Sequence, residues 1–116
     1  MTVGIASITF DTTDPEPLAR WWADRFGAEI IANMDGFFVL VAGGSLPAQL
    51  AFQKVEDPTP GKNKLHLDVR TDDDLDVEVA RWVDAGATSL GQRNAGDFQW
   101  VTLTDPDGNE FCIAAG

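Results

Sequence analysis

Cysteine and histidine are scarce in this sequence, which contains one of each, Cys112 and His66. A lone cysteine excludes an intrachain disulfide framework and a four-cysteine zinc site. No apolar run approaches the roughly 18–20 residues that are needed to span a bilayer. The first residues also lack the basic start and the long apolar stretch of a signal peptide. We therefore expect a cytoplasmic protein without a membrane anchor.

Basic residues are also few, with eight Lys plus Arg against nineteen Asp plus Glu and a net charge of −11. Such a field repels polyanions, so we expect neither nucleic-acid binding nor attachment to anionic membranes. The acidic excess favours solubility, and it would also attract a cationic small molecule. The 116 residues are 44% hydrophobic and 23% charged, which is typical of a single globular domain or of two half-domains that share a core.

The first half of the chain predicts one helix among several strands. Residues 3–12 are rich in β-branched and apolar side chains, which favours a strand. A capping residue, Thr13 or Asp14, precedes Pro15 and opens a helix. Apolar side chains then recur at helical spacing until Gly27. Three further strand candidates follow, at residues 28–32, 36–42 and 49–55.

The second half repeats this order after a stretch rich in Pro and Gly at residues 57–63. Residues 65–71 predict a strand, and the acids of residues 72–74 suit a helix N-terminus, where the helix dipole favours negative charge. Gly86 ends that helix. Three more strand candidates complete the chain, at residues 87–92, 98–104 and 110–114.

The order βαβββ therefore occurs twice, which indicates an internal repeat. A shift of 59 residues pairs Gly27 with Gly86 and Phe52 with Phe111. We expect a single α+β domain over residues 1–116, with module one over about 1–57 and module two over about 64–116. The apolar faces of its strands would pack on the apolar stripes of the two helices.

Alternation along the strands predicts a polar face opposite the helices, because side chains two residues apart share a face. His66 and Asp68 point away from the apolar set of Leu65, Leu67 and Val69. The 59-residue shift maps Ser7 onto His66 and Gln53 onto Cys112. We therefore expect four side chains to converge: Ser7, Gln53, His66 and Cys112. Polar or aromatic neighbours that can share this face are Thr9, Asp68, Trp100 and Glu110.

Three stretches of the chain carry a family resemblance: DPEPLARWWADRFGAEI, LAFQKVEDPTPGKNKLHLDV and WVTLTDPDGNEFCI. The DPDGN turn and the HLDV strand are the most specific. Their order and spacing resemble the vicinal oxygen chelate superfamily of glyoxalases, extradiol dioxygenases, and fosfomycin and bleomycin resistance proteins. More narrowly, they resemble small glyoxalase-like domain proteins. The resemblance implies two βαβββ modules that form a curved mixed sheet around a cleft, and it implies a homodimer.

The same resemblance bears on metal binding. Metal-dependent members usually chelate one divalent ion through a His, a Glu, a second His and a second Glu. The matching positions here are Ser7, Gln53, His66 and Cys112, so three of the four depart from that pattern. Ser and Gln are weak ligands for a divalent ion. We therefore expect no cofactor, although His66 and Cys112, helped by Glu110 or Asp68, leave a metal site open.

Three functions remain open at this point. The chain can bind a small organic metabolite in the cleft, with lyase or isomerase chemistry in which His66 is the catalytic acid or base. It can instead sequester a cationic or aromatic compound without turnover, as bleomycin resistance members do, or act as a divalent-metal lyase or dioxygenase. Whether the chain is an enzyme is left undecided. The candidate ligand contacts are Ser7, Thr9, Gln53, Asp68, Trp100, Glu110 and Cys112.

Overall fold

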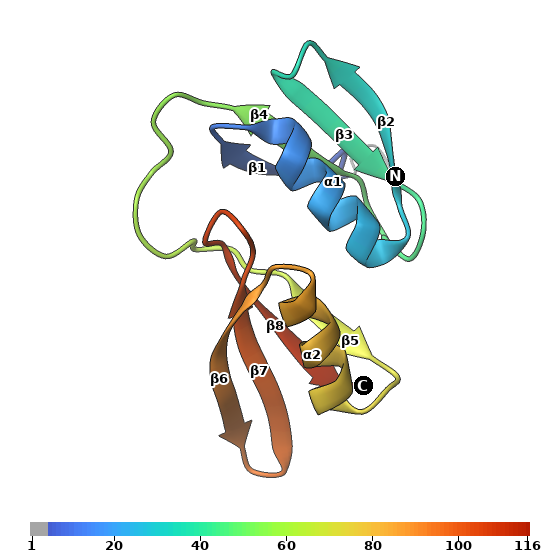
Figure 1. Cartoon of the computed structure of the whole chain (residues 1–116), viewed down its shortest axis with the longest axis vertical. Coiled ribbons are helices and arrows are strands. Elements are labelled where there is room, and N and C mark those ends of the chain that lie inside the picture. Colours follow the sequence, from blue (N-terminus) through green and yellow to red (C-terminus); the bar gives the residue numbers. More distant parts are fainter. Residues whose placement is uncertain (1–4) are drawn as a thin grey trace. The chain divides into compact units, whose positions relative to one another are not determined.

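The computed structural model describes residues 5–116 and contains the order βαβββ twice (Figure 1). The chain divides into two compact units, Met1–Thr59 and Pro60–Gly116, here called module one and module two. Each module has its own four-stranded mixed sheet and one helix, which confirms the predicted fold class. Val3, where the first strand was predicted to begin, lies outside the described residues. No helix in the described part of the chain is long and apolar enough to cross a membrane.

Module one is a mixed sheet in the order β1-β4-β3-β2, with one helix. Its elements are β1 (Ile8–Thr12), α1 (Pro15–Phe26), β2 (Glu29–Met34), β3 (Phe38–Ala42) and β4 (Leu50–Lys54). β1 pairs in parallel with β4, and the other pairs are antiparallel. The helix begins at Pro15 and ends at Gly27, whose φ of 63° is in the left-handed region, as the sequence predicts. Trp22 and Phe52 are fully buried in the core between helix and sheet.

Module two has the same architecture, with sheet order β5-β8-β7-β6. Its elements are β5 (Asp68–Thr71), α2 (Leu75–Asp84), β6 (Thr88–Ala95), β7 (Phe98–Thr104) and β8 (Glu110–Ala115). The Asp74 side chain accepts hydrogen bonds from two backbone N–H groups of the first helical turn. Trp82 of α2 packs on Phe111 of β8, with ring centroids 5.1 Å apart. One face of this sheet is therefore covered by α2.

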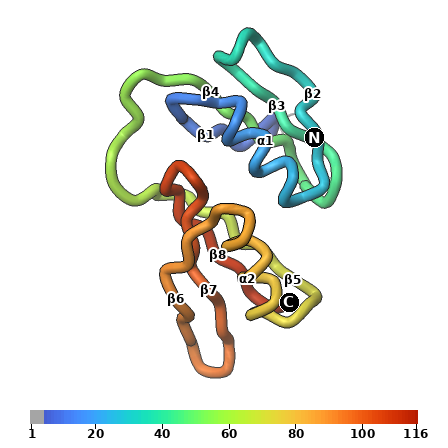
Figure 2. The backbone as a smooth tube through the Cα atoms, viewed as in Figure 1, coloured from blue at the N-terminus to red at the C-terminus, as the bar shows by residue number. Residues whose placement is uncertain are grey.

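The strand β5 is shorter than predicted. It begins at Asp68, so His66 lies on the segment before the strand, and Leu65 is 70% exposed instead of packed in the core. The backbone N–H of Cys112 still donates to the Leu67 carbonyl at 3.0 Å. The path from β4 through the linker into this segment can be followed in Figure 2. The hydrogen bond to Leu67 keeps His66 beside β8 although the regular strand has not yet begun.

The internal repeat is real, but its shift is not constant. Thr12 and Thr71 are equivalent, because each is buried and its hydroxyl accepts a hydrogen bond from the backbone N–H two residues on. The carbonyl of Thr12 accepts from the Val55 N–H at 2.9 Å, and that of Thr71 accepts from the Gly116 N–H at 3.0 Å. The shift is thus 59 residues from β1 to β5 and 61 residues from β4 to β8.

This change of register corrects two sequence-based matches, that of Phe52 with Phe111 and that of Gln53 with Cys112. Thr9 pairs with Ala51 in module one, and Asp68 pairs with Cys112 in module two. Because Thr9 corresponds to Asp68, the residue equivalent to Cys112 is Ala51. The match of Gln53 with Cys112 by the repeat was wrong by two residues.

Candidate functional site

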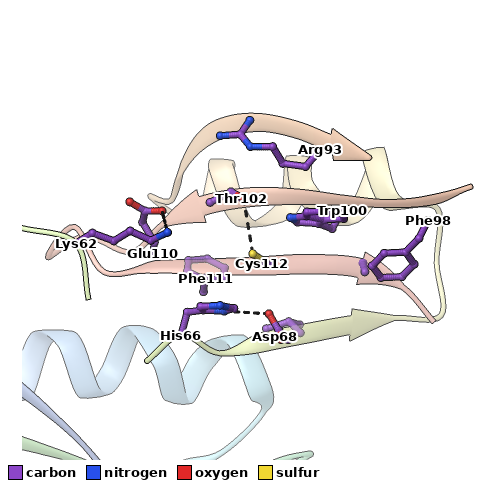
Figure 3. Close-up of a pocket in the computed structure, with 12 residues that line it drawn as sticks. Lys62, His66, Asp68, Arg93, Phe98, Trp100, Thr102, Glu110, Phe111 and Cys112 are labelled. Carbon is purple, nitrogen blue, oxygen red and sulfur yellow. Dashed lines mark hydrogen bonds and ion pairs between the residues drawn. The ribbon is translucent and has the colours of Figure 1, made fainter. Parts of the chain in front are cut away.

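The face of the module-two sheet opposite α2 holds a cavity of about 520 Å³ (Figure 3). All four strands of the sheet, or the residues just before them, contribute to it. Twelve residues line it: Lys62, His66, Asp68, Val69, Arg93, Phe98, Trp100, Thr102, Glu110, Phe111, Cys112 and Ala114.

The strand register brings the lining side chains together. Cys112 of β8 lies between Asp68 of β5 and Thr102 of β7, its partners in the two ladders. On β7, Trp100 lies two residues before Thr102, so the two side chains share a face of the sheet. Trp100 in turn pairs with Arg93 of β6. The alternation of the strands thus makes a row of polar and aromatic side chains across the sheet, while Ile113 is fully buried on β8.

His66 and Asp68 form the closest side-chain pair in the cavity, with Nδ1 and Oδ1 3.1 Å apart. The side chains are 44% and 74% exposed, so solvent screens their interaction. In the neutral imidazole, the nitrogen beside a carboxylate carries the proton and donates it in a hydrogen bond. Nε2 then keeps its lone pair and can accept a proton or a hydrogen bond from a ligand.

Asn63 fixes the segment that carries His66. Its Nδ2 donates to the carbonyls of Leu65 at 2.7 Å and Glu110 at 2.9 Å, and its Oδ1 accepts from the Glu110 N–H at 2.7 Å. The neighbouring Lys62 Nζ lies 3.7 Å from Glu110 Oε1. One amide side chain therefore satisfies backbone groups of the segment before β5 and of the first residue of β8, where regular strand pairing is absent.

The DPDGN turn, residues 105–109, connects β7 to β8. Asp105 is 3% exposed, and its Oδ1 accepts from the backbone N–H groups of Asp107 and Asn109, both at 2.9 Å. Its Oδ2 accepts from the Asn109 side chain at 2.9 Å. A buried carboxylate with this many donors is well satisfied. The turn therefore sets where Glu110 and Cys112 enter the sheet.

Five of the predicted site residues meet at this cavity: His66, Asp68, Trp100, Glu110 and Cys112. The other three, Ser7, Thr9 and Gln53, belong to module one and do not line it. Ser7 and Thr9 lie within hydrogen-bond distance of each other, with Oγ and Oγ1 3.3 Å apart. Their roles in ligand binding, like that of Gln53, stay predictions.

Sequence reasoning missed Asn63, Arg93, Phe98 and Thr102 as site residues. Phe98 and Thr102 alternate with Trp100 along β7, so the period-two rule could have found them. Arg93 was missed because the predicted strand ended at residue 92, whereas β6 extends to Ala95 and pairs Arg93 with Trp100. The role of Asn63 depends on contacts 47 residues away in sequence.

The donor chemistry of the site can be compared with the four-ligand ion site that the resemblance implies. In module one, Ser7 and either Gln53 or its register-corrected counterpart Ala51 do not supply strong ligands. In module two, His66, Asp68 and Cys112 each offer one donor atom, and these atoms lie within 4.8 Å of one another. Imidazole, carboxylate and thiolate are ligand types of zinc. The residues thus fit a three-donor zinc site in kind, but not the four-ligand pattern.

The sequence of the chain matches that of a known protein family. The sequence model described as Glyoxalase-like domain matches residues 7–114, which is nearly the whole chain. The chain belongs to this family. The matched residues of this glyoxalase-like chain include the HLDV segment, the DPDGN turn and all the strands and helices of both modules except the last residue of β8. No curated protein matches its sequence significantly.

Solved structures of the wider vicinal oxygen chelate superfamily share the fold of this glyoxalase-like chain. A glyoxalase/bleomycin resistance protein/dioxygenase family enzyme from Burkholderia phytofirmans PsJN has a TM-score of 0.80 at 20% identity, over 97% of this chain and 98% of that one. Fosfomycin resistance protein FosX from Listeria monocytogenes, in complex with Mn(II) and 1S,2S-dihydroxypropylphosphonic acid, has a TM-score of 0.80 at 18% identity, over 100% and 92%. Lactoylglutathione lyase from Agrobacterium tumefaciens has a TM-score of 0.70 at 18% identity, over 97% and 93%. At these identities the similarity shows the fold alone.

Proposed function

We propose that the chain binds a small organic metabolite in the module-two cavity and that His66 transfers a proton there. The observation that carries the proposal is the His66–Asp68 pair, with Nδ1 and Oδ1 3.1 Å apart, on the wall of a cavity of about 520 Å³. A volume in this range suits a small ligand. The solved relatives include a lyase and a protein in complex with a small phosphonic acid, which supports small-molecule chemistry on this fold.

The two side chains divide the chemistry between them. The Asp68 carboxylate accepts a hydrogen bond from Nδ1–H, which leaves Nε2 to remove a proton from a bound ligand or to return one. A lyase or an isomerase needs such a transfer at a carbon or oxygen atom of its substrate. Removal of a general acid or base typically lowers the rate about 100-fold or more. We therefore expect a His66→Gln variant to bind ligand but to lose most of any turnover.

A thermal-shift screen with a library of small metabolites tests the binding step. Phe98 lines the cavity and is 55% exposed, whereas Phe37 is 61% exposed and is not among the lining residues, so the variants Phe98→Ala and Phe37→Ala are a matched pair. A true ligand should raise the melting temperature of the wild type and of Phe37→Ala, and should do so less for Phe98→Ala. A screen in which no compound gives this pattern would contradict the proposal.

Sequestration without turnover is the second candidate, and recovery of the ligand separates it from catalysis. Each hit is incubated with wild type and with His66→Gln, and is then identified by NMR. Conversion in the wild type that disappears in the variant supports proton transfer by His66. Unchanged ligand in both samples, with binding intact, supports a sequestering protein.

A further inference from the structure

We infer that the module-two cavity has an oxyanion subsite at Arg93, beside an aromatic shelf of Phe98 and Trp100, and that its ligands are small planar carboxylic acids. The inference rests on the proposed function, because it specifies the class of metabolite that the cavity takes. It reverses the sequence-based expectation of a cationic ligand, which followed from the net charge of −11.

The charges that line the cavity are paired, with one exception. Lys62 lies 3.7 Å from Glu110, and His66 lies 3.1 Å from Asp68. Within residues 5–116, no carboxylate lies within ion-pair distance of Arg93. Its one side-chain hydrogen bond runs from Nη1 to the Leu90 carbonyl at 3.4 Å. The unpaired charge on the cavity wall is therefore positive, although acids outnumber bases by nineteen to eight in the chain.

The backbone of β6 makes room for this guanidinium. The strand changes register between Ser89 and Gly91, and Gly91 has a φ of 113°, where side chains are rarely tolerated. A Cβ atom at Gly91 would lie 3.2 Å from Arg93 Nη1, which is closer than most contacts that Cβ atoms make in proteins. The glycine thus lets the arginine fold back along β6 toward the Leu90 carbonyl. Most of its five N–H donors stay available to a ligand.

Aromatic side chains lie on β7, the strand that pairs with β6. Trp100 is the ladder partner of Arg93, and its ring centroid is 5.6 Å from that of Phe98. Trp100 is half-buried and Phe98 is 55% exposed, so this shelf offers apolar surface that the described residues leave open. A planar group can stack on it while an attached carboxylate meets Arg93 in a bidentate pair. The acidic net charge does not prevent this, because salt screens charges beyond about 8 Å.

Benzoate and benzamide are the probes, because they share a shape and differ in charge. Each is titrated into the ¹⁵N-labelled full chain, and binding is followed at the Trp100 indole and at residues of β7. We expect benzoate to bind about tenfold more tightly than benzamide, the size of a typical charge-assisted pair. Arg93→Gln should remove this preference, and Arg93→Lys should keep part of it because the charge remains.

Arg81→Gln is the matched control, since it removes the same charge from α2, on the other side of the sheet. Arg81 is already paired: the hydrogen bond that its guanidinium donates to the Asp73 carboxylate is the main cause that raises its pKa. We expect this variant to keep the tenfold preference. A preference lost equally in Arg81→Gln would mean a general charge effect and would overturn the inference.

Two other outcomes also overturn it, and they differ in their meaning for the proposed function. Equal affinity of benzoate and benzamide, with shifts at the cavity, would remove the oxyanion subsite and leave a ligand-binding cavity in place. No shift with either probe would count against both the subsite and the cavity as a binding site. Amide spectra of each variant, recorded without probe, establish that it is folded.

Discussion

His66 and Asp68, two residues apart in the sequence, place their side chains on the same side of the chain. Alternation predicted their shared face, and the structure confirms it with the 3.1 Å contact. The contact itself was not predictable, because His66 lies before β5 and its position depends on Asn63. Arg93 was also missed, since the predicted strand ended one residue before it, whereas β6 extends to Ala95. The sequence thus predicted which types of residue meet at the cavity, but not where the strands that carry them begin and end.

The tautomer of His66 is a residue-scale prediction. Because Asp68 accepts from Nδ1, we expect the neutral imidazole of the wild type to carry its proton mainly on Nδ1. Asp68→Ala should shift the population toward the Nε2–H form. Long-range ¹H–¹⁵N correlation spectra of the imidazole measure the ratio. The control is Asp72→Ala, which removes an exposed acid that pairs with Arg70. The same tautomer ratio in all three proteins would argue against the role of Asp68.

Replacement of Asn63 tests whether its side-chain amide holds the segment before β5 against the start of β8. Asn63→Ala removes three hydrogen bonds to Leu65 and Glu110. At about 0.5–1.5 kcal/mol for each bond, we expect the free energy of unfolding to fall by about 2 kcal/mol. Asn94→Ala, on an exposed strand, should cost less than about 0.5 kcal/mol. Urea denaturation measures both, and equal effects would mean that Asn63 has no special structural role.

At the scale of elements, the helices and strands followed the sequence closely while the repeat hid an offset. Both helices begin where a proline or a capping acid predicts, and β7 spans the predicted residues 98–104. The two-residue slip between β4 and β8 left no trace in the hydrophobic pattern, because side chains alternate with a period of two. An even slip keeps each apolar residue on the core face. The offset is seen in the backbone hydrogen bonds of Val55 and Gly116 and in the strand registers.

The two helix caps predict unequal costs for the same substitution. Asp74 accepts from the N–H groups of Asp76 at 3.0 Å and Val77 at 3.3 Å, whereas the Asp14 side chain makes no capping hydrogen bond. Asp74→Ala should therefore lower the free energy of unfolding by about 1 kcal/mol, and Asp14→Ala by less. Urea denaturation of the two variants gives the comparison. A larger loss for Asp14→Ala would contradict the cap assignment.

At the scale of the whole molecule, metal content separates the proposed function from the metal enzyme that the sequence left open. Two of the three donors in module two, His66 and Asp68, are exposed, and the matched positions in module one offer no strong fourth ligand. We therefore predict less than one zinc, nickel, manganese or iron ion per chain by elemental analysis after incubation with each metal. One bound ion per chain that is lost in both His66→Ala and Cys112→Ser would contradict this and favour the three-donor site.

The assembly state is a second prediction at this scale. The family resemblance implies a homodimer, and several large apolar side chains are exposed on the chain, among them Ile31, Met34 and Phe37. Burial of such groups between copies is a common use of exposed apolar surface. Sedimentation velocity at micromolar concentration should give the mass of two chains. A single species with the mass of one chain would remove the prediction.

Gly91 has a consequence for how ligand preference can change in evolution. It has no side chain to touch a ligand, yet a methyl group there would lie 3.2 Å from the Arg93 guanidinium. Any larger residue would displace that charge and strain the strand. With the proposed role of Arg93, a substitution at Gly91 can therefore change ligand selectivity, although surveys of ligand-contacting residues would not include this position. Mutational libraries aimed at new selectivity should include position 91 together with the cavity wall.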